Sequence, residues 1–248
     1  MGIIPILKKL KVGQIERDDG PNSHLRKQGT PTMGGIIISL SIIIVSTLVM
    51  LYYYKIDSNV AIRIIPLLLV TIGFGTVGFV DDFKKLILKN TKGLKPAYKM
   101  LGLLAISVMY TLYLVKGTAL GIETYIPIIK EYIKMSVLIY IPFAIFVMLA
   151  TTNAVNLTDG VDGLSTSVCT IIITCLTVIG IIFDVKEVVI FGSIVVGTCL
   201  GFLLFNLHPA KVFMGDTGSL LLRWGYKCIG AIFENAFNNI SDCTYTCY

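Results

Sequence analysis

Charged side chains are scarce in this sequence. Asp, Glu, Lys and Arg together make up 15% of the 248 residues, whereas soluble domains carry about 25%. Hydrophobic residues make up 55%, and they form uninterrupted runs close to the roughly 20 residues that a helix needs to cross a bilayer. A soluble core does not need apolar runs of that length, so the shortage of charge excludes a soluble domain and favours a membrane protein.

Other signals are missing too. No P-loop string occurs, and the six cysteines do not have the spacing of a metal site. The net charge of +6 comes from basic residues in short loops between apolar runs, where such residues determine topology rather than bind nucleic acid. We therefore expect no nucleic-acid partner and a lipid bilayer as the environment.

Six apolar runs predict the fold class, an all-α polytopic transmembrane helical bundle whose cytoplasmic loops form the active site. Each run is about long enough to cross a hydrocarbon core of roughly 30 Å as a helix. The runs cover residues 34–54, 64–80, 100–115, 135–150, 164–183 and 188–207. Residues 1–6 resemble the remnant of a seventh span, and the residues after Ser219 are a candidate start of an eighth.

The orientation of the bundle follows from its basic residues. The loops 1–33 and 81–99 lie on the same side of the membrane, because two predicted spans separate them, and they hold twelve Lys and Arg residues. The connections on the opposite side hold six. The side with more basic residues is expected to be cytoplasmic. Even numbers of predicted spans separate it from residues 151–163 and 208–216, so these residues are expected on the same side. All the unusual polar motifs of the chain then face the cytoplasm.

Asp81 and Asp82 follow directly on an apolar run that ends at Val80. Two acids at the cytoplasmic end of a span oppose the usual excess of basic residues there. Adjacent carboxylates also repel each other unless a cation or a proton lies between them. A solvent anchor at a helix end is the simpler alternative, but the like-charge argument favours a functional pair.

Residues 153–163, Asn-Ala-Val-Asn-Leu-Thr-Asp-Gly-Val-Asp-Gly, form the densest polar cluster between two spans. The glycines permit close approach of a ligand to the backbone, and Asn or Asp can cap the helix expected from Leu164, leaving N–H groups for an anion. A capped turn needs fewer polar side chains, and an EF-hand needs a terminal glutamate that is missing. A substrate-binding loop is therefore predicted, with candidate residues Asn153, Asn156, Asp159 and Asp162.

The remaining motifs are residues 213–219, Phe-Met-Gly-Asp-Thr-Gly-Ser, and the loop 20–35. The first places Asp216 between two glycines, next to hydroxyl groups. In the second, Lys27 is suited to hold a phosphate by charge, and Thr32 to cap the following span. Carboxylates that converge from separate loops suit Mg²⁺, which takes one or two carboxylates together with substrate phosphates and water.

At these residues the sequence resembles the phospho-N-acetylmuramoyl-pentapeptide transferases, within the superfamily of polyprenyl-phosphate sugar-1-phosphate transferases. The matching strings lie at 20–35, 79–82, 153–164 and 209–219, and the resemblance covers about residues 1 to 220. The string Gly-Thr-Pro-Thr-Met-Gly-Gly at 29–35 is specific to this family. The Asp-Asp and Asn-x-x-Asn-x-x-Asp-Gly-x-Asp-Gly strings are shared across the superfamily.

The resemblance implies a reaction, a cofactor and roles for residues. UDP-MurNAc-pentapeptide and undecaprenyl phosphate would give lipid I and UMP, with Mg²⁺, at the cytoplasmic face of the bacterial inner membrane. Asp81, Asp82 and Asp216 are implied as catalytic residues, with Asp216 and Asp82 as metal ligands and Asp81 deprotonating or orienting the lipid phosphate. Substrate contacts are implied for Lys27, Thr30, Thr32, Asn153, Asn156, Asp159 and Asp162.

The chain departs from the family pattern at both ends. Residues 1–220 are expected to be an incomplete transferase domain, and residues 221–248 an aberrant tail that a frameshift would explain. Whether such a chain is active, and whether it forms a homodimer, is left open. Three alternatives also stay open: transfer of GlcNAc-1-phosphate to a polyprenyl phosphate, an inactive fragment, and a transporter, which would place its acids near mid-span.

Overall fold

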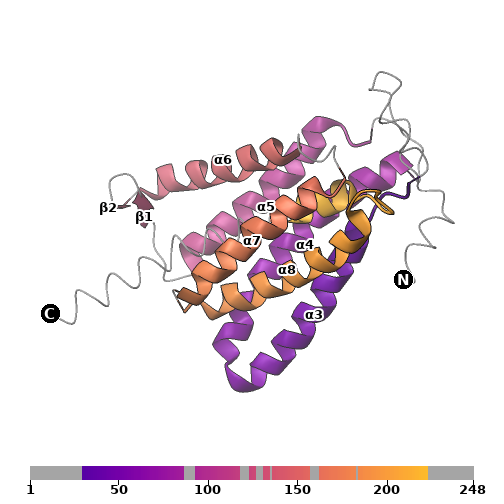
Figure 1. The fold of residues 1–248 in the computed structure, drawn as a ribbon. Coiled ribbons are helices and arrows are strands. Elements are labelled where there is room, and N and C mark those ends of the chain that lie inside the picture. The colour runs from indigo at the N-terminus through magenta and orange to yellow at the C-terminus, as the bar shows by residue number, and fades with distance from the viewer. Residues whose placement is uncertain are drawn as a thin grey trace.

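The computed structural model describes residues 30–86, 93–117, 123–126, 131–134, 136–156, 162–182 and 184–222. Six long helices account for most of this part of the chain (Figure 1). They are α3 (Gly35–Ile56), α4 (Ser58–Leu86), α5 (Pro96–Gly117), α6 (Val137–Asn156), α7 (Leu164–Ile182) and α8 (Lys186–Asn206). Residues 215–222 form a further helical segment.

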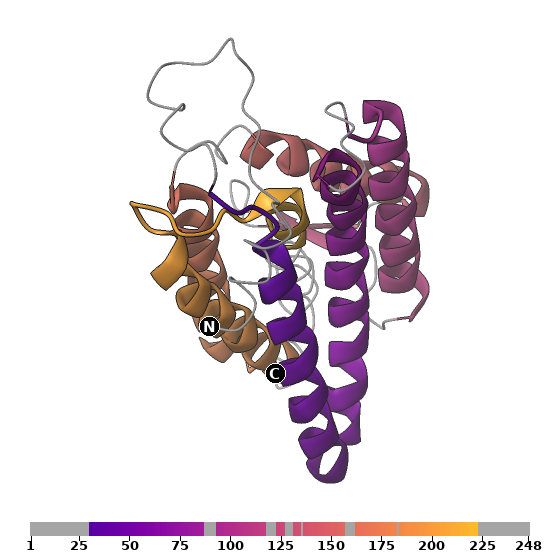
Figure 2. The ribbon, with the colours of Figure 1, turned by 90° about the vertical axis from the view of Figure 1, so that its right-hand side faces the viewer.

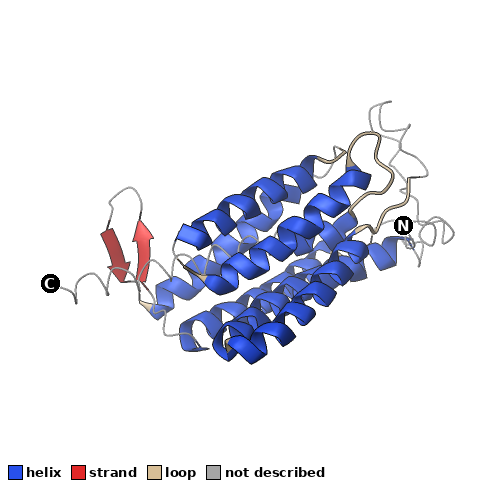
Figure 3. Ribbon diagram, turned by 60° about the horizontal axis from the view of Figure 1, so that its bottom comes forward, coloured by secondary structure: helices blue, strands red, loops and turns tan. Residues whose placement is uncertain are grey.

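The prediction of a helical membrane bundle is confirmed. Five helices, α3, α4, α5, α7 and α8, are long and apolar enough to cross a membrane, and α6 contributes the shorter apolar stretch Val137–Phe146. The helices run roughly side by side (Figure 3). The sequence pattern did not predict an antiparallel hairpin between α5 and α6, formed by β1 (Glu123–Ile126) and β2 (Glu131–Lys134). Strands of four residues are too short to show a clear alternation.

Helix α4 is longer than the apolar run that predicts it. The run covers residues 64–80, whereas the helix extends from Ser58 to Leu86. Asp81 and Asp82 therefore lie in the last turns of the helix and not in a loop after it. Both carboxylates accept hydrogen bonds from other segments of the chain, so the helix can continue past the apolar run with these acids buried.

Helix α4 is also the centre of the bundle. It packs against α3, α5 and α8, and its side chains Ile64, Leu67 and Phe74 are fully buried. Helices α7 and α8 pack closely as a pair, while α6 packs mainly against α5 at the edge of the bundle (Figure 1). Large apolar side chains such as Leu69 and Leu204 are exposed, as expected for a surface that faces lipid.

Three glycines of α4, Gly73, Gly75 and Gly78, have the spacing of a dinucleotide-binding loop. Such a loop follows a strand and opens a helix, but these glycines lie in the interior of α4. They serve packing instead. A Cβ at Gly75 would come within 3.0 Å of the Leu221 side chain, and one at Gly78 would overlap the carbonyl oxygen of Asp216. The glycines thus let the segment 215–222 approach the backbone of α4.

The bundle has two unlike ends. At one end lie the C-terminal end of α4, the start of α5, the start of α7 and the segment between α8 and residue 222 (Figures 1 and 3). At the other end lie the α3–α4 turn, the α7–α8 turn and the β-hairpin. Figure 2 shows α3 and α4 side by side, with the segment after α8 close to the start of α3. The described parts of all four predicted motifs meet at the first end.

Candidate active site

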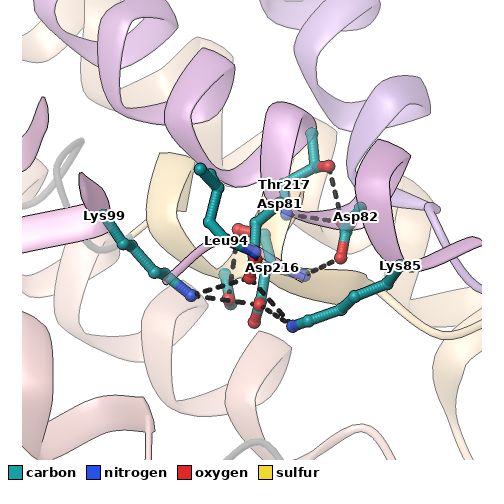
Figure 4. Close-up of polar contacts among 8 residues, drawn as sticks. Asp81, Asp82, Lys85, Leu94, Lys99, Asp216 and Thr217 are labelled. Carbon is teal, nitrogen blue, oxygen red and sulfur yellow. Dashed lines mark hydrogen bonds and ion pairs between the residues drawn. The ribbon is translucent and has the colours of Figure 1, made fainter. Parts of the chain in front are cut away.

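The last turns of α4 carry two carboxylates with different neighbours. Successive residues of an α-helix are about 100° apart around its axis, so Asp81 and Asp82 face different segments. Asp81 is 2% exposed. Its Oδ1 accepts a hydrogen bond from the Leu94 backbone N–H at 2.7 Å. Its Oδ2 forms ion pairs with Lys85 Nζ at 2.8 Å and Lys99 Nζ at 3.2 Å (Figure 4).

Asp216 reaches the same two lysines from the segment after α8. Its Oδ2 lies 2.7 Å from Lys85 Nζ and 3.0 Å from Lys99 Nζ, so each ammonium group bridges the carboxylates of Asp81 and Asp216. Burial alone would raise the pKa of Asp216. The charges of Lys99 and Lys85 and the hydrogen bond from Lys85 outweigh burial, so the pKa lies well below its ordinary value and the carboxylate is ionised at neutral pH.

Sequence reasoning left open whether Lys85 and Lys99 only determine topology, and it did not place them in the site. Lys85 lies one helical turn after Asp81, at the (i, i+4) spacing at which opposite charges meet on a helix. That spacing is a signal that the sequence offers. Lys99 lies in the first turn of α5, and only the packing of α5 against α4 brings it to the carboxylates.

Asp82 contacts the helical segment 215–222. It is 4% exposed. Its Oδ1 accepts a hydrogen bond from the Asp216 N–H at 3.1 Å, and its Oδ2 accepts from the N–H and the hydroxyl of Thr217 at 2.8 and 2.6 Å. These N–H groups belong to the first turn of the segment, where no intrahelical partner exists for them. Asp82 therefore caps this segment from another helix.

The predicted loop 20–35 is described from Thr30 onward, and we refer to residues 30–35 as the strap. The strap runs along the residues that precede Asp216, and backbone hydrogen bonds join the two segments. The Phe213 N–H donates to the Pro31 carbonyl at 2.9 Å, the Gly34 N–H to the Phe213 carbonyl at 2.8 Å, and the Gly35 N–H to the Met214 carbonyl at 2.8 Å. The strap thus fixes the path of the chain into Asp216.

Two threonines predicted as substrate contacts belong to the strap. Thr30 is half-buried and Thr32 is buried. A Cβ added at Gly215 would come within 3.2 Å of Thr32 Oγ1, so Thr32 lies against the turn before Asp216. The expectation that Thr32 caps the following helix is wrong, because the N-cap of α3 is Gly34 and has no side-chain hydrogen bond. Lys27 lies outside the described residues.

Buried polar contacts link the start of α7 to the segment 207–214. The Thr166 hydroxyl donates to Asn206 Oδ1 at 2.7 Å, and Asn206 Nδ2 donates to the Val212 carbonyl at 3.0 Å. Nearby, Asp162 Oδ2 lies 3.1 Å from Nδ1 of the exposed His208. Sequence reasoning missed this link, although Asn206 is an amide at the end of an apolar run. It joins the predicted substrate loop to the segment that leads to Asp216.

The other residues of the predicted substrate loop are described less fully. Asn153 and Asn156 lie at the C-terminal end of α6, which is the same end of the bundle as Asp81. Asp159 lies outside the described residues. Asp162 contacts His208, as described above. The assignment of all four residues to substrate binding stays a prediction.

Asp216 is the carboxylate that fits a divalent cation best. Asp81 and Asp216 each direct one oxygen at the same two ammonium groups, so Lys85 and Lys99 already hold the position between them. The Asp216 side chain is 18% exposed, against 3% for Asp81, and Mg²⁺ needs only one or two carboxylates from a protein. In the described ranges, no group of three or more acid, histidine or cysteine side chains is arranged to hold a metal. Asp82, the other predicted ligand, already accepts three hydrogen bonds, so its contacts favour a different role.

The chain is similar to known proteins along most of its length. Residues 64–232 match the model of glycosyl transferase family 4, and residues 27–38 match signature 1 of the phospho-N-acetylmuramoyl-pentapeptide-transferases. That signature includes the whole strap. The range 64–232 contains the part of α4 that carries the two aspartates, and the segment with Asp216.

Curated proteins that bear the name phospho-N-acetylmuramoyl-pentapeptide-transferase are among the relatives. The protein of Caldicellulosiruptor bescii is 44% identical over 232 residues, which are 94% of this chain and 69% of the relative. The protein of Halalkalibacterium halodurans is 46% identical over 219 residues (88% and 66%), and that of Acetivibrio thermocellus is 43% identical over 233 residues (94% and 68%). The chain thus spans about two thirds of the length of these relatives. With the helices, the strap and the Asp216 segment all inside the matched regions, the chain belongs to glycosyl transferase family 4, among the phospho-N-acetylmuramoyl-pentapeptide-transferases.

Proposed function

We propose that this chain transfers phospho-MurNAc-pentapeptide from UDP-MurNAc-pentapeptide to undecaprenyl phosphate, giving lipid I and UMP at the cytoplasmic face of the bacterial inner membrane. The observation that carries this proposal is the pairing of Asp81 and Asp216 through two shared lysines, Lys85 and Lys99. This pairing lies at one end of a membrane bundle whose relatives bear the name of that enzyme.

The reaction brings two negatively charged phosphate groups together. An oxygen of the lipid phosphate forms a bond to the phosphorus that carries the sugar, and the bond between that phosphorus and UMP breaks. Phosphoryl transfer depends mainly on positioning and on neutralising charge. The side chains of Lys85 and Lys99 are 37% and 19% exposed, so their ammonium groups stay accessible to phosphate oxygens, which they bind by charge-assisted hydrogen bonds.

The two carboxylates have different tasks. Asp216, which is ionised, would hold Mg²⁺, and the ion would supply positive charge that neutralises and polarises the diphosphate. Asp81 orients the lipid phosphate or accepts its proton. Because the site lies at the end of the spans, the phosphate of the lipid reaches it while the hydrocarbon chain stays in the bilayer.

Proteoliposomes that contain the full chain test this function. With undecaprenyl phosphate and UDP-MurNAc-pentapeptide, we expect a lipid-linked product that forms with Mg²⁺, stops when EDTA removes the metal, and returns when Mg²⁺ is restored. An excess of UDP-GlcNAc should leave the rate unchanged, whereas a transferase for GlcNAc-1-phosphate would be inhibited. Uptake of a solute without turnover of lipid phosphate would point to a transporter and end the proposal.

The roles of the carboxylates need their own control. Asp81→Asn and Asp216→Asn keep the size of each side chain and remove its charge. We expect both variants to lose turnover while they still insert into the membrane and unfold cooperatively, at a lower temperature than the unmodified chain because a buried ion pair is broken. Full turnover in both variants would discard the roles assigned here.

A further inference from the structure

Asp82 lies directly behind the carboxylate that is proposed to hold the metal. The N–H group that donates to Asp82 Oδ1 is that of Asp216 itself, and the next N–H along the chain donates to Asp82 Oδ2. Two successive N–H groups held by one carboxylate fix the peptide planes on both sides of the Asp216 Cα. They thereby fix the direction in which the Asp216 side chain leaves the backbone.

The Thr217 hydroxyl strengthens this arrangement. It donates to Asp82 Oδ2 at 2.6 Å, which is at the short end of the range for O–H···O hydrogen bonds. The three hydrogen bonds join residues that are about 135 positions apart in the chain. We call the contacts of Asp82 with Asp216 and Thr217 the clamp.

The space around the clamp is filled. A Cβ at Gly215 would come within 2.7 Å of Asp82 Oδ2, and Gly215 has a φ of 74°, a left-handed conformation that favours glycine. On the other side, a Cβ at Gly78 would overlap the carbonyl oxygen of Asp216. Residue 216 is therefore held between α4 and the strap, and a change in Asp82 cannot be absorbed without moving it.

Asp82 has little capacity left for a ligand. A carboxylate offers about four lone-pair positions, and three of them receive the donors of the clamp. The residue is 4% exposed, whereas the side chain of Asp216 is 18% exposed. We propose that Asp82 is a positioning residue, which acts through Asp216 by holding its backbone so that the Asp216 carboxylate reaches Lys85, Lys99 and the metal. The test of this role by turnover rests on the proposed function.

A double-mutant cycle of Asp82→Asn and Thr217→Val tests the clamp, with kcat and KM measured on the full chain. Thr217→Val leaves every carboxylate in place, yet we expect kcat to fall about tenfold with little change in either KM. Asp82→Asn should lower kcat about 100-fold, because a displacement of about 1 Å has such an effect. The double variant should be no slower than Asp82→Asn, since both changes break one clamp.

Thr217→Ser is the matched control, because it keeps the hydroxyl and should keep the kcat of the unmodified chain. If Asp82 binds the metal or takes the proton itself, Thr217→Val will retain full kcat. If Thr217→Val does lower kcat but the two effects multiply in the double variant, the two side chains act independently. Either result overturns the proposal.

Two further measurements do not depend on turnover. Mn²⁺ binding, followed by electron paramagnetic resonance in the absence of substrates, should weaken several-fold in Thr217→Val and stay unchanged in Thr217→Ser. Thermal unfolding of the four members of the cycle should show losses that do not add. If the unmodified chain forms no lipid-linked product, the proposed function fails, but these measurements still decide the role of Asp82. Additive losses of stability would overturn the clamp.

Discussion

The two ends of the bundle hold charge in different ways. At the site end, Asp81 and Asp82 are almost fully buried, and each carboxylate has several donors. At the other end, Arg63 and Glu187 form a single ion pair of 3.3 Å, and the Arg63 side chain is 66% exposed. The Glu187 side chain is 11% exposed, between those of Asp81 (3%) and Asp216 (18%), but its ion pair is with the exposed Arg63. A pair with an exposed member contributes about 1 kcal/mol or less, whereas removing one partner of a fully buried pair costs about 3–5 kcal/mol. The comparison teaches that the number of donors around each buried carboxylate, and not burial or the presence of acids alone, distinguishes the candidate site.

Removal of one carboxylate from each end is the strongest test of this difference. Asp216→Asn should lower kcat about 1,000-fold, because the charge that faces both lysines, and that is proposed to hold the metal, is lost. Glu187→Gln, at the other end, should leave kcat within about twofold. The measurement is the initial rate of lipid I formation in proteoliposomes. Similar losses in the two variants would remove the distinction between the ends.

A pair of lysine variants within the site end sharpens the comparison between the two ends. Lys99→Met should lower kcat/KM about 300-fold, since the ammonium group that bridges Asp81 and Asp216 is lost. Lys95→Met removes the same charge from an exposed position four residues earlier and should stay within about twofold of the unmodified chain. Because both changes affect topology equally, equal rates in the two variants would reduce Lys99 to a topology determinant.

Backbone packing at the site end gives a third comparison. Gly78→Ala should lower kcat about 100-fold, because the new Cβ overlaps the Asp216 carbonyl oxygen and displaces that residue. Gly201→Ala in α8 is the control, since a Cβ there meets nothing within 4 Å, and alanine in a helix is more favourable than glycine. We expect Gly201→Ala to unfold at the same or a higher temperature. Normal turnover by Gly78→Ala would show that residue 216 has room to move.

The smallest effect is expected at the far end. Arg63→Gln should lower the free energy of unfolding by about 1 kcal/mol or less, because the Arg63 side chain is 66% exposed and gives up one 3.3 Å contact with Glu187. Turnover should not change. Unfolding in detergent micelles, followed by circular dichroism, measures the difference. A loss of several kcal/mol would mean that the far end also depends on its charges.

Much of the architecture was predictable because a bilayer permits few solutions. Long apolar runs must form helices there, since each backbone polar group needs a partner within the segment. Parity along the chain then placed Asp81 and Asp216 at one end of the bundle, and the structure brings them together through Lys85 and Lys99. That step needed only the number of spans between the two motifs.

The separate surroundings of Asp81 and Asp82 were not predictable in the same way. Two identical neighbours look equivalent in a sequence, and their difference depends on α4 continuing through both of them to Leu86. The strap shows a similar limit. Its threonines suggest binding, yet its backbone bonds to residues 213 and 214 and the close approach of Gly35 to Gly218 depend on tertiary packing, of which local composition gives no sign.

The clamp also has a consequence for biogenesis. Helices α5 to α8 all lie between Asp82 and Thr217 in the chain, so the ribosome must deliver these helices to the membrane before Asp82 meets its donors. A chain whose synthesis stops after α8 would carry both aspartates of α4 without the segment that they hold. Catalytic competence would thus arise late in membrane insertion, after every helix from α3 to α8 has been delivered.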